Sequence, residues 1–151
     1  MKKKNNLFFL FLLFFAAGCT NNPGKEKKPE NDIDAARDFI RAALDGKFDI
    51  AKTYMLQDSS NIQYLDAVSR NYQKLSDSTK DGYRESSINI HLVNPVNDST
   101  TVVVYSNSFM KDKDTLKVCR LHQQWLVDLK YIFEHNMDTL INKQNKIDTI
   151  Q

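Results

Sequence analysis

The histidines and cysteines of this 151-residue sequence, which could serve as metal ligands, nucleophiles or bases, are few and widely spaced. The histidines are His91, His122 and His135, and the cysteines are Cys19 and Cys119. A structural zinc site needs four ligands at short spacings, and nucleophilic catalysis needs a nucleophile beside a base. The sequence shows neither pattern and no Gly-rich phosphate loop. We therefore predict no metal, no cofactor and no assigned catalytic residue.

Cys19 is distinguished by what precedes it. Three lysines at 2–4 are followed by an unbroken apolar run at 7–17 and then by Gly18. A helix that crosses a bilayer needs roughly 20 apolar residues, so this run is too short for a retained span. A basic start, a short apolar core and small residues at its end describe a secretory signal. A conventional signal with a chance cysteine is the alternative.

The residues Ala16, Ala17, Gly18 and Cys19 resemble the lipobox of bacterial lipoprotein signals, in which small residues precede an obligatory cysteine. Ala16 stands where leucine is usual. The resemblance implies cleavage between Gly18 and Cys19, a diacylglyceryl group on the Cys19 sulfur and acylation of the new amine. Two or three acyl chains anchor a protein stably, so we expect a membrane partner through a lipid anchor. Thr20 replaces the inner-membrane retention Asp of enteric bacteria, which favours an outer-membrane location facing the periplasm or the cell surface.

Composition divides the chain into four parts. We predict a signal peptide at 1–18, a flexible tether at 19–31, one folded domain at 32–134 and a polar tail at 135–151. The tether is rich in small, polar and charged residues, as linkers are. Without the three leader lysines, 18 of the 21 basic residues remain, and the chain has 19 acidic residues, so its net charge is −1. A nearly neutral net charge does not indicate the basic surface that binds nucleic acid.

Helical periodicity dominates the first half of the domain. Apolar residues recur every three or four positions over 33–44, with Asn31 or Asp32 as the N-cap and Gly46 as the stop. A second short helix is predicted over 48–55 and a third over 62–75. The third helix ends before a hydroxyl-rich stretch.

Strand signals follow in the second half. We predict a loop at 76–82, a strand within 86–93, a turn at 94–98, a strand within 99–109 and two more strands within 115–133. Alternation in the first strand groups its three aliphatic residues on one face: Ile88, Ile90 and Leu92.

The register of the last hairpin can be predicted from which residues would share a face of the sheet. If Leu121 faces Gln124, then Arg120 faces Trp125, and the guanidinium can lie over the indole. Residues 122–123 then form a two-residue turn, although a four-residue loop has the same parity. One face of this hairpin then carries its large apolar residues, Leu116, Val118, Trp125, Val127 and Leu129.

Helices followed by an antiparallel meander predict an α+β fold, with the helices packed on one face of the sheet. Residues 33–133 resemble the nuclear-transport-factor-2-like (cystatin-like) superfamily, and its small lipoprotein domains of unknown function in particular. The opening stretch 35–55 and the closing stretch 117–130 carry the resemblance. Trp125, Val127 and Asp128 correspond to its tryptophan-containing last strand, but the usual Gly-containing turn before Trp125 is missing. The resemblance implies a cone in which N-terminal helices pack on a curved antiparallel sheet, with a cavity at its wide end.

Several residues are candidates for chemistry in that cone. Asp128 could be a base, but the register sets it opposite Lys117, so we interpret it as a solvated ion pair. His91 is interpreted as a hydrogen-bonded residue of a polar face, and Cys119 as a small packing residue. Four tyrosines are candidates for the cavity rim or for the core: Tyr54, Tyr72, Tyr105 and Tyr131.

These patterns give one leading hypothesis and two alternatives. The leading hypothesis is a lipid-anchored envelope protein whose non-catalytic domain binds a small apolar ligand or an envelope protein. A small isomerase- or hydrolase-like enzyme using Asp128 or His91 would need a carboxylate or histidine in a closed apolar pocket. A structural subunit of an envelope complex would need a filled cone and a large apolar patch. The oligomeric state is left open.

Overall fold

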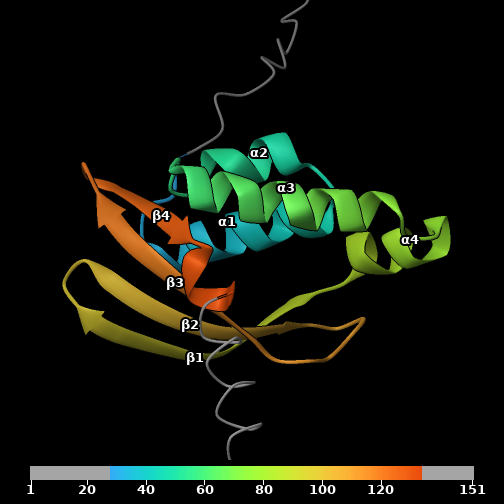
Figure 1. The fold of residues 1–151 in the computed structure, drawn as a ribbon. Coiled ribbons are helices and arrows are strands. Elements are labelled where there is room, and N and C mark those ends of the chain that lie inside the picture. The colour runs from blue at the N-terminus through green and yellow to red at the C-terminus, as the bar shows by residue number, and fades with distance from the viewer. Residues whose placement is uncertain (1–27, 134–151) are drawn as a thin grey trace, which may run out of the picture.

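The computed structural model describes residues 28–133, which form four helices followed by a four-stranded sheet (Figure 1). The predicted α+β class, with N-terminal helices packed on a curved antiparallel sheet, is confirmed. The signal, Cys19 and His135 lie outside the described residues, as do most of the tether and all of the tail. The elements are α1 Asp32–Leu44, α2 Phe48–Thr53, α3 Ser59–Gln73, α4 Asp77–Glu85, β1 Ile88–Asn97, β2 Thr100–Asn107, β3 Asp114–Leu121 and β4 Gln124–Asp128.

Helix α1 begins and ends as its sequence predicts. Asn31 is the N-cap, and its Oδ1 accepts a hydrogen bond of 2.8 Å from the Asp34 amide. At the other end Gly46 has a φ of 75°. The amide of Gly46 donates to the Ala43 carbonyl and that of Lys47 to the Ala42 carbonyl, which is the Schellman pattern.

The sheet is an antiparallel meander in the order β1-β2-β3-β4. The predicted register of the last hairpin is confirmed, with Leu121 opposite Gln124 and Arg120 opposite Trp125. The Arg120 Cζ atom lies 5.7 Å from the centroid of the indole. The turn has two residues, His122 and Gln123, with φ of 47° and 67°, so it is a primed turn that matches the twist of the strands.

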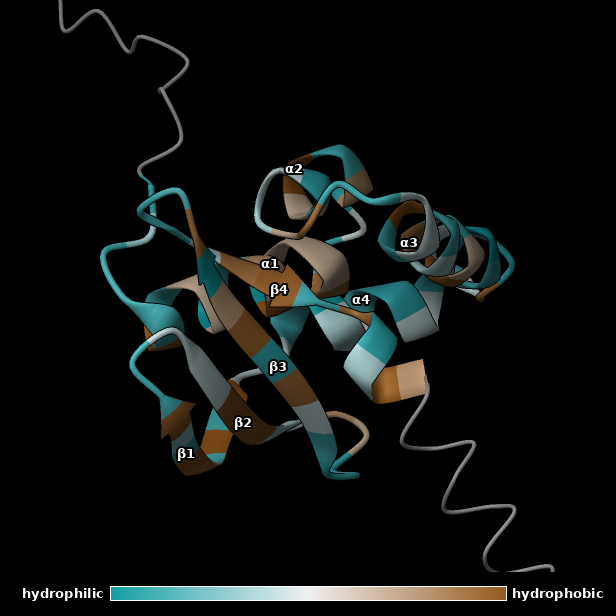
Figure 2. Cartoon of the chain, turned by 60° about the vertical axis from the view of Figure 1, so that its left-hand side comes forward, coloured by the Kyte–Doolittle hydropathy of each residue, from teal (hydrophilic) through white to brown (hydrophobic). Residues whose placement is uncertain are grey.

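The core lies between α1 and the inner faces of β3 and β4. Apolar and polar residues alternate along β3 (Figure 2), so one face of the strand can be buried. Within residues 28–133, none of the helices combines the length and apolar character needed to cross a bilayer. The fully buried large side chains include Met55, Leu116, Val103, Val118 and Val127.

The loop predicted at 76–82 is wrong, because this stretch forms most of α4. Ser76 caps the helix, and its Oγ accepts a hydrogen bond from the Thr79 amide. Gly82 lies within α4 against Phe109, and a Cβ there would come within 2.5 Å of the Phe109 ring. The small residue therefore allows the β2–β3 loop to approach the helix closely.

Two predictions about β1 are also wrong. The turn predicted at 94–98 is replaced by continuing strand, and the chain turns only at Asp98 and Ser99. Pro95 is accommodated because β1 is an edge strand. A bulge between Ile90 and Leu92 shifts the register, so Leu92 leaves the face shared by Ile88 and Ile90 and is 54% exposed.

The second helix is shorter than predicted, because the chain after Thr53 pairs with the sheet. The Val127 amide donates to the Tyr54 carbonyl at 2.8 Å, and the Leu56 amide donates to the Val127 carbonyl at 2.9 Å. Met55 between them is fully buried. This pairing fixes the end of α2 against β4.

Candidate functional site

The structure contains an apolar pocket of about 380 Å³ between the helices and one end of the sheet. We call it the aromatic pocket. The C-terminal halves of α1 and α3 form its walls, together with residues of α2, α4 and β2. Its lining residues are Phe39, Ile40, Ala43, Leu44, Phe48, Val68, Asn71, Tyr72, Leu75, Tyr83, Tyr105 and Asn107.

Aromatic rings in mutual contact form one wall of this pocket. Phe48 packs edge-on against Tyr72 with centroids 5.4 Å apart, and Tyr72 lies 6.3 Å from Tyr83. Tyr83 in turn packs edge-on against Phe109 at 5.3 Å. Such pairs stabilise each other beyond their area burial. The wall is therefore preformed by contacts between α2, α3, α4 and the β2–β3 loop.

The hydroxyl end of Tyr72 is held against the end of α1. Its hydroxyl donates a hydrogen bond of 3.2 Å to the Leu44 carbonyl. A Cβ at Gly46 would lie 2.6 Å from the Tyr72 ring. Gly46 thus serves twice, because it adopts the left-handed backbone that ends α1 and leaves room for the ring.

The polar groups of the aromatic pocket are uncharged. Asn71 and Asn107 contribute carboxamides, and three tyrosines contribute hydroxyls. Burial, and then the nearby Asp114 carboxylate, raise the pKa of Tyr105 above its usual value, so this phenol stays neutral. Among the described residues, the lining has no carboxylate, imidazole or cation. The arrangement can hold an apolar body and hydrogen-bond a neutral group.

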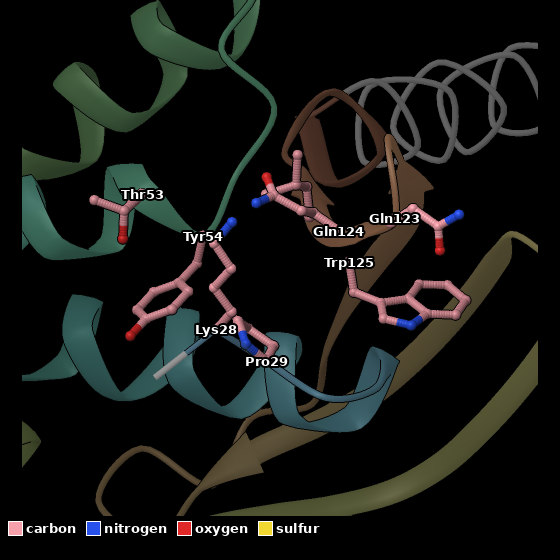
Figure 3. A pocket seen from close by; sticks show the side chains of 8 residues that line it. Lys28, Pro29, Thr53, Tyr54, Gln123, Gln124 and Trp125 are labelled. Carbon is pink, nitrogen blue, oxygen red and sulfur yellow. The ribbon is translucent and has the colours of Figure 1, made fainter. Parts of the chain in front are cut away.

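A smaller pocket of about 210 Å³ lies beside the β3–β4 turn. We call it the hairpin-end pocket. In Figure 3, Lys28, Pro29 and Gln124 lie between the rings of Tyr54 and Trp125. It is therefore built where the first described residues of the chain meet β4.

Asp128 is paired as predicted, but it is not solvated. Its Oδ2 lies 3.1 Å from the Lys117 Nζ, and only 7% of the side chain is exposed. Its Oδ1 accepts a hydrogen bond from the Asn61 Nδ2 at 3.3 Å and another from the Lys130 amide. The prediction of a solvated pair is wrong, because α3 places Asn61 against the end of β4.

Asn61 is the centre of this polar cluster, whose members are Asp58, Asn61, Lys117, Asp128 and Lys130. Asn61 is fully buried. Its Nδ2 donates to Asp58 at 2.7 Å and to Asp128, and its Oδ1 accepts from the Leu129 amide at 2.6 Å. Within residues 28–133 no buried side-chain nitrogen or oxygen is left without a partner. The cluster thus joins α3 to β4 and the turn after it.

The Asp58 carboxyl should titrate unusually low. Hydrogen bonds from the Asn61 amide and side chain, with a smaller contribution from Lys130, lower its pKa from 3.8 to about 2. The lowered pKa means that the stabilisation is present above pH 3.8 and is lost as the pH falls toward 2. We expect an NMR titration of this carboxyl to have its midpoint near 2. Asp58→Asn should reduce the dependence of the urea midpoint on pH between those values, and an unchanged dependence would contradict this assignment.

The remaining candidates lie apart from the aromatic pocket. The His91 Nε2 is 2.8 Å from the Ser106 Oγ, so its interpretation as a hydrogen-bonded histidine is confirmed. Cys119 is a half-buried free thiol, and burial raises its pKa, which fits a packing residue. His122 lies in the hairpin turn. Within residues 28–133 no group of His, Cys, Asp and Glu has the arrangement of a metal site.

The four tyrosines named from the sequence separate into different places. Tyr72 and Tyr105 line the aromatic pocket. Tyr54 lines the hairpin-end pocket, and the Lys117 Nζ lies 6.0 Å from the ring of Tyr131. Sequence reasoning missed Tyr83, because it lies on the helix that was predicted as a loop. The N-cap signal at residues 76–79 indicates the start of that helix and could have been used to predict it.

Comparison with solved structures finds a similar protein. It is an NTF-2-like protein of unknown function from Shewanella oneidensis MR-1, with a TM-score of 0.46 and 17% sequence identity, covering 63% of this chain and 89% of that one. No family model and no curated protein matches the sequence.

Proposed function

We propose that this chain is a lipid-anchored protein of the bacterial cell envelope whose domain binds a small apolar molecule in the aromatic pocket. The observation that carries the binding function is the pocket itself. Its volume of about 380 Å³ lies in the range of small-molecule sites. Its walls are aromatic and aliphatic, and a few neutral polar groups can orient a ligand.

The anchoring rests on the sequence that precedes the domain. Lysines at 2–4, the apolar run at 7–17 and the small residues before Cys19 occur in the order that lipid attachment requires. The following stretch, 20–31, has the polar and charged composition of a linker that joins the anchor to the domain. The domain would then act next to the membrane that holds it.

The two alternatives have less support. An enzyme using Asp128 or His91 would need one of these groups in the apolar pocket, and neither lines it. Asp128 already contacts Lys117 and Asn61. A purely structural subunit would need a filled interior, whereas the aromatic pocket is open to a ligand.

We expect Ala43→Leu to weaken binding of the neutral apolar dye N-phenyl-1-naphthylamine about tenfold, because the larger side chain fills the aromatic pocket. Dye fluorescence titrated against the purified protein measures the dissociation constant. Val68→Asp is a second variant. Val68 is 38% exposed at the pocket wall, so a charge there should oppose the dye without unfolding α3.

Val96→Leu is the matched control, since Val96 is 58% exposed and lies outside the pocket. It should bind the dye as the parent does. If both pocket variants stay folded by circular dichroism and still bind the dye with parental affinity, the aromatic pocket is not the binding site.

A further inference from the structure

The first described residues enter the domain beside the β3–β4 turn. Lys28 and Pro29 line the hairpin-end pocket together with Gln123, Gln124 and Trp125. The segment that leads back to Cys19 therefore starts at this end of the sheet (Figure 1).

The tether is short compared with the domain. Cys19 and Lys28 are nine residues apart, so even a fully extended chain spans only about 30 Å. With the acyl chains of Cys19 in a bilayer, Lys28 must stay within that distance of the surface, and the β3–β4 turn lies beside Lys28. We propose that this end of the domain rests on the bilayer, with Leu121 and Trp125 at the headgroup level. The proposal rests on the lipid anchor proposed above.

The side chains at this end suit a membrane interface. Leu121 is 47% exposed next to the turn. Trp125 pairs across the hairpin with Arg120, whose guanidinium lies over the indole. Tryptophan is enriched at the headgroup level, and long cationic side chains reach it from apolar surfaces. The end of the hairpin thus carries an aliphatic group on one face of the sheet, and an aromatic and a cationic group on the other.

The β1–β2 turn extends the same surface. The Arg120 amide donates a hydrogen bond of 2.8 Å to the Ser99 carbonyl, which places this turn beside the last hairpin. Val96, just before it, is 58% exposed. Figure 1 shows both turns at one end of the sheet and the β2–β3 loop at the other.

The charge at this end points to a zwitterionic phospholipid surface. Lys28 and Arg120 supply positive charge, while Glu30, Asp34 and Asp38 line a groove that also borders Lys28. A surface that binds anionic lipid specifically carries clustered Lys and Arg without such acids. Apolar and aromatic contact, with both signs of charge nearby, suits phosphocholine and phosphoethanolamine headgroups.

This orientation also places the aromatic pocket. The pocket lies at the C-terminal end of α1, and the hairpin-end pocket lies near the start of that helix. The 13 residues of α1 span about 20 Å. The aromatic pocket therefore faces away from the bilayer and receives its ligand from the aqueous side.

Trp125 is the single tryptophan of the chain and reports directly on this contact. The lipidated protein that begins at Cys19 is reconstituted into phosphatidylcholine vesicles, with or without bromine at acyl carbons 6 and 7. We expect brominated vesicles to reduce Trp125 emission about twofold. Leu121→Asp, or Val96→Asp as a second variant, should abolish most of that quenching, because a charge opposes contact with the acyl region.

Leu92→Asp is the matched control. Leu92 is 54% exposed. It pairs with Val104, and Val104 pairs with Thr115. Thr115 lies about 20 Å from Leu121 along β3. The control variant should be quenched as the parent is, and equal loss in Leu92→Asp and Leu121→Asp would overturn the orientation. Vesicle flotation separates the two proposals. If the protein floats but Trp125 is not quenched, the orientation alone is overturned, which is the result expected if a protein partner covers this end. If the protein does not float, both proposals are overturned.

Discussion

Cys19→Ser should move the protein from the membrane fraction to the soluble fraction. Each buried methylene contributes about 0.8 kcal/mol, and a single acyl chain already gives a membrane partition of about 10⁴ M⁻¹. Loss of the two or three chains that a lipobox implies should therefore reduce partition by at least about 10⁴-fold. Fractionation of cells by ultracentrifugation measures the change, and intact-mass spectrometry shows whether the lipid mass at Cys19 has disappeared.

Cys119→Ser is the control for this experiment, because it removes the other cysteine of the chain. Cys119 lies on β3 opposite Leu126, so its replacement leaves the lipobox intact. This variant should stay with the membrane and keep the parental mass, apart from the substituted atom. The anchor proposal fails if Cys19→Ser protein sediments with membranes and is trimmed as the parent is.

Local signals predicted the parts of the fold that local physics determines. Asn31 caps α1, and Gly46 ends it, because each type suits the backbone needed there. The register of the last hairpin could be predicted because a slip of one residue would have put apolar and polar residues on the same face of the sheet. The turn at 122–123 forms without glycine, although both residues need positive φ. Histidine is one of the types that tolerate it.

Other features depend on contacts between distant segments. The bulge beside His91 inverts the faces of β1, and alternation alone does not show where a strand is bulged. Asp128 has Lys117 opposite it, as predicted, but it is buried by Asn61, which is 67 residues away in the sequence. Neither residue type nor spacing indicates such a contact.

The aromatic pocket was predictable only in part for the same reason. Tyr72 and Tyr105 were candidates from helix and strand periodicity, and both line it. Tyr83 completes the wall from α4, which the sequence predicted as a loop. The missed helix therefore left Tyr83 out of the predicted site.

Asn61→Ala should lower the free energy of unfolding by about 3 kcal/mol. The substitution leaves the buried Leu129 amide without its acceptor and removes a donor from the buried Asp128 carboxylate. An unsatisfied buried group costs about 1–3 kcal/mol, and a hydrogen bond to a charged group contributes about 1.5–3. Urea unfolding followed by circular dichroism measures the loss. The pKa of Asp58 should rise from about 2 toward 3.8 in the same variant.

Asn71→Ala on the same helix separates this network from the helix itself. Asn71 is exposed, so its replacement should change the free energy of unfolding by less than about 0.5 kcal/mol. Combining Asn61→Ala with Asp128→Asn then tests the pair. Because the two side chains share a hydrogen bond, the double variant should lose less stability than the two single losses added together. Additive losses, or equal unfolding of Asn61→Ala and Asn71→Ala, would show that the polar cluster does not hold α3 to β4.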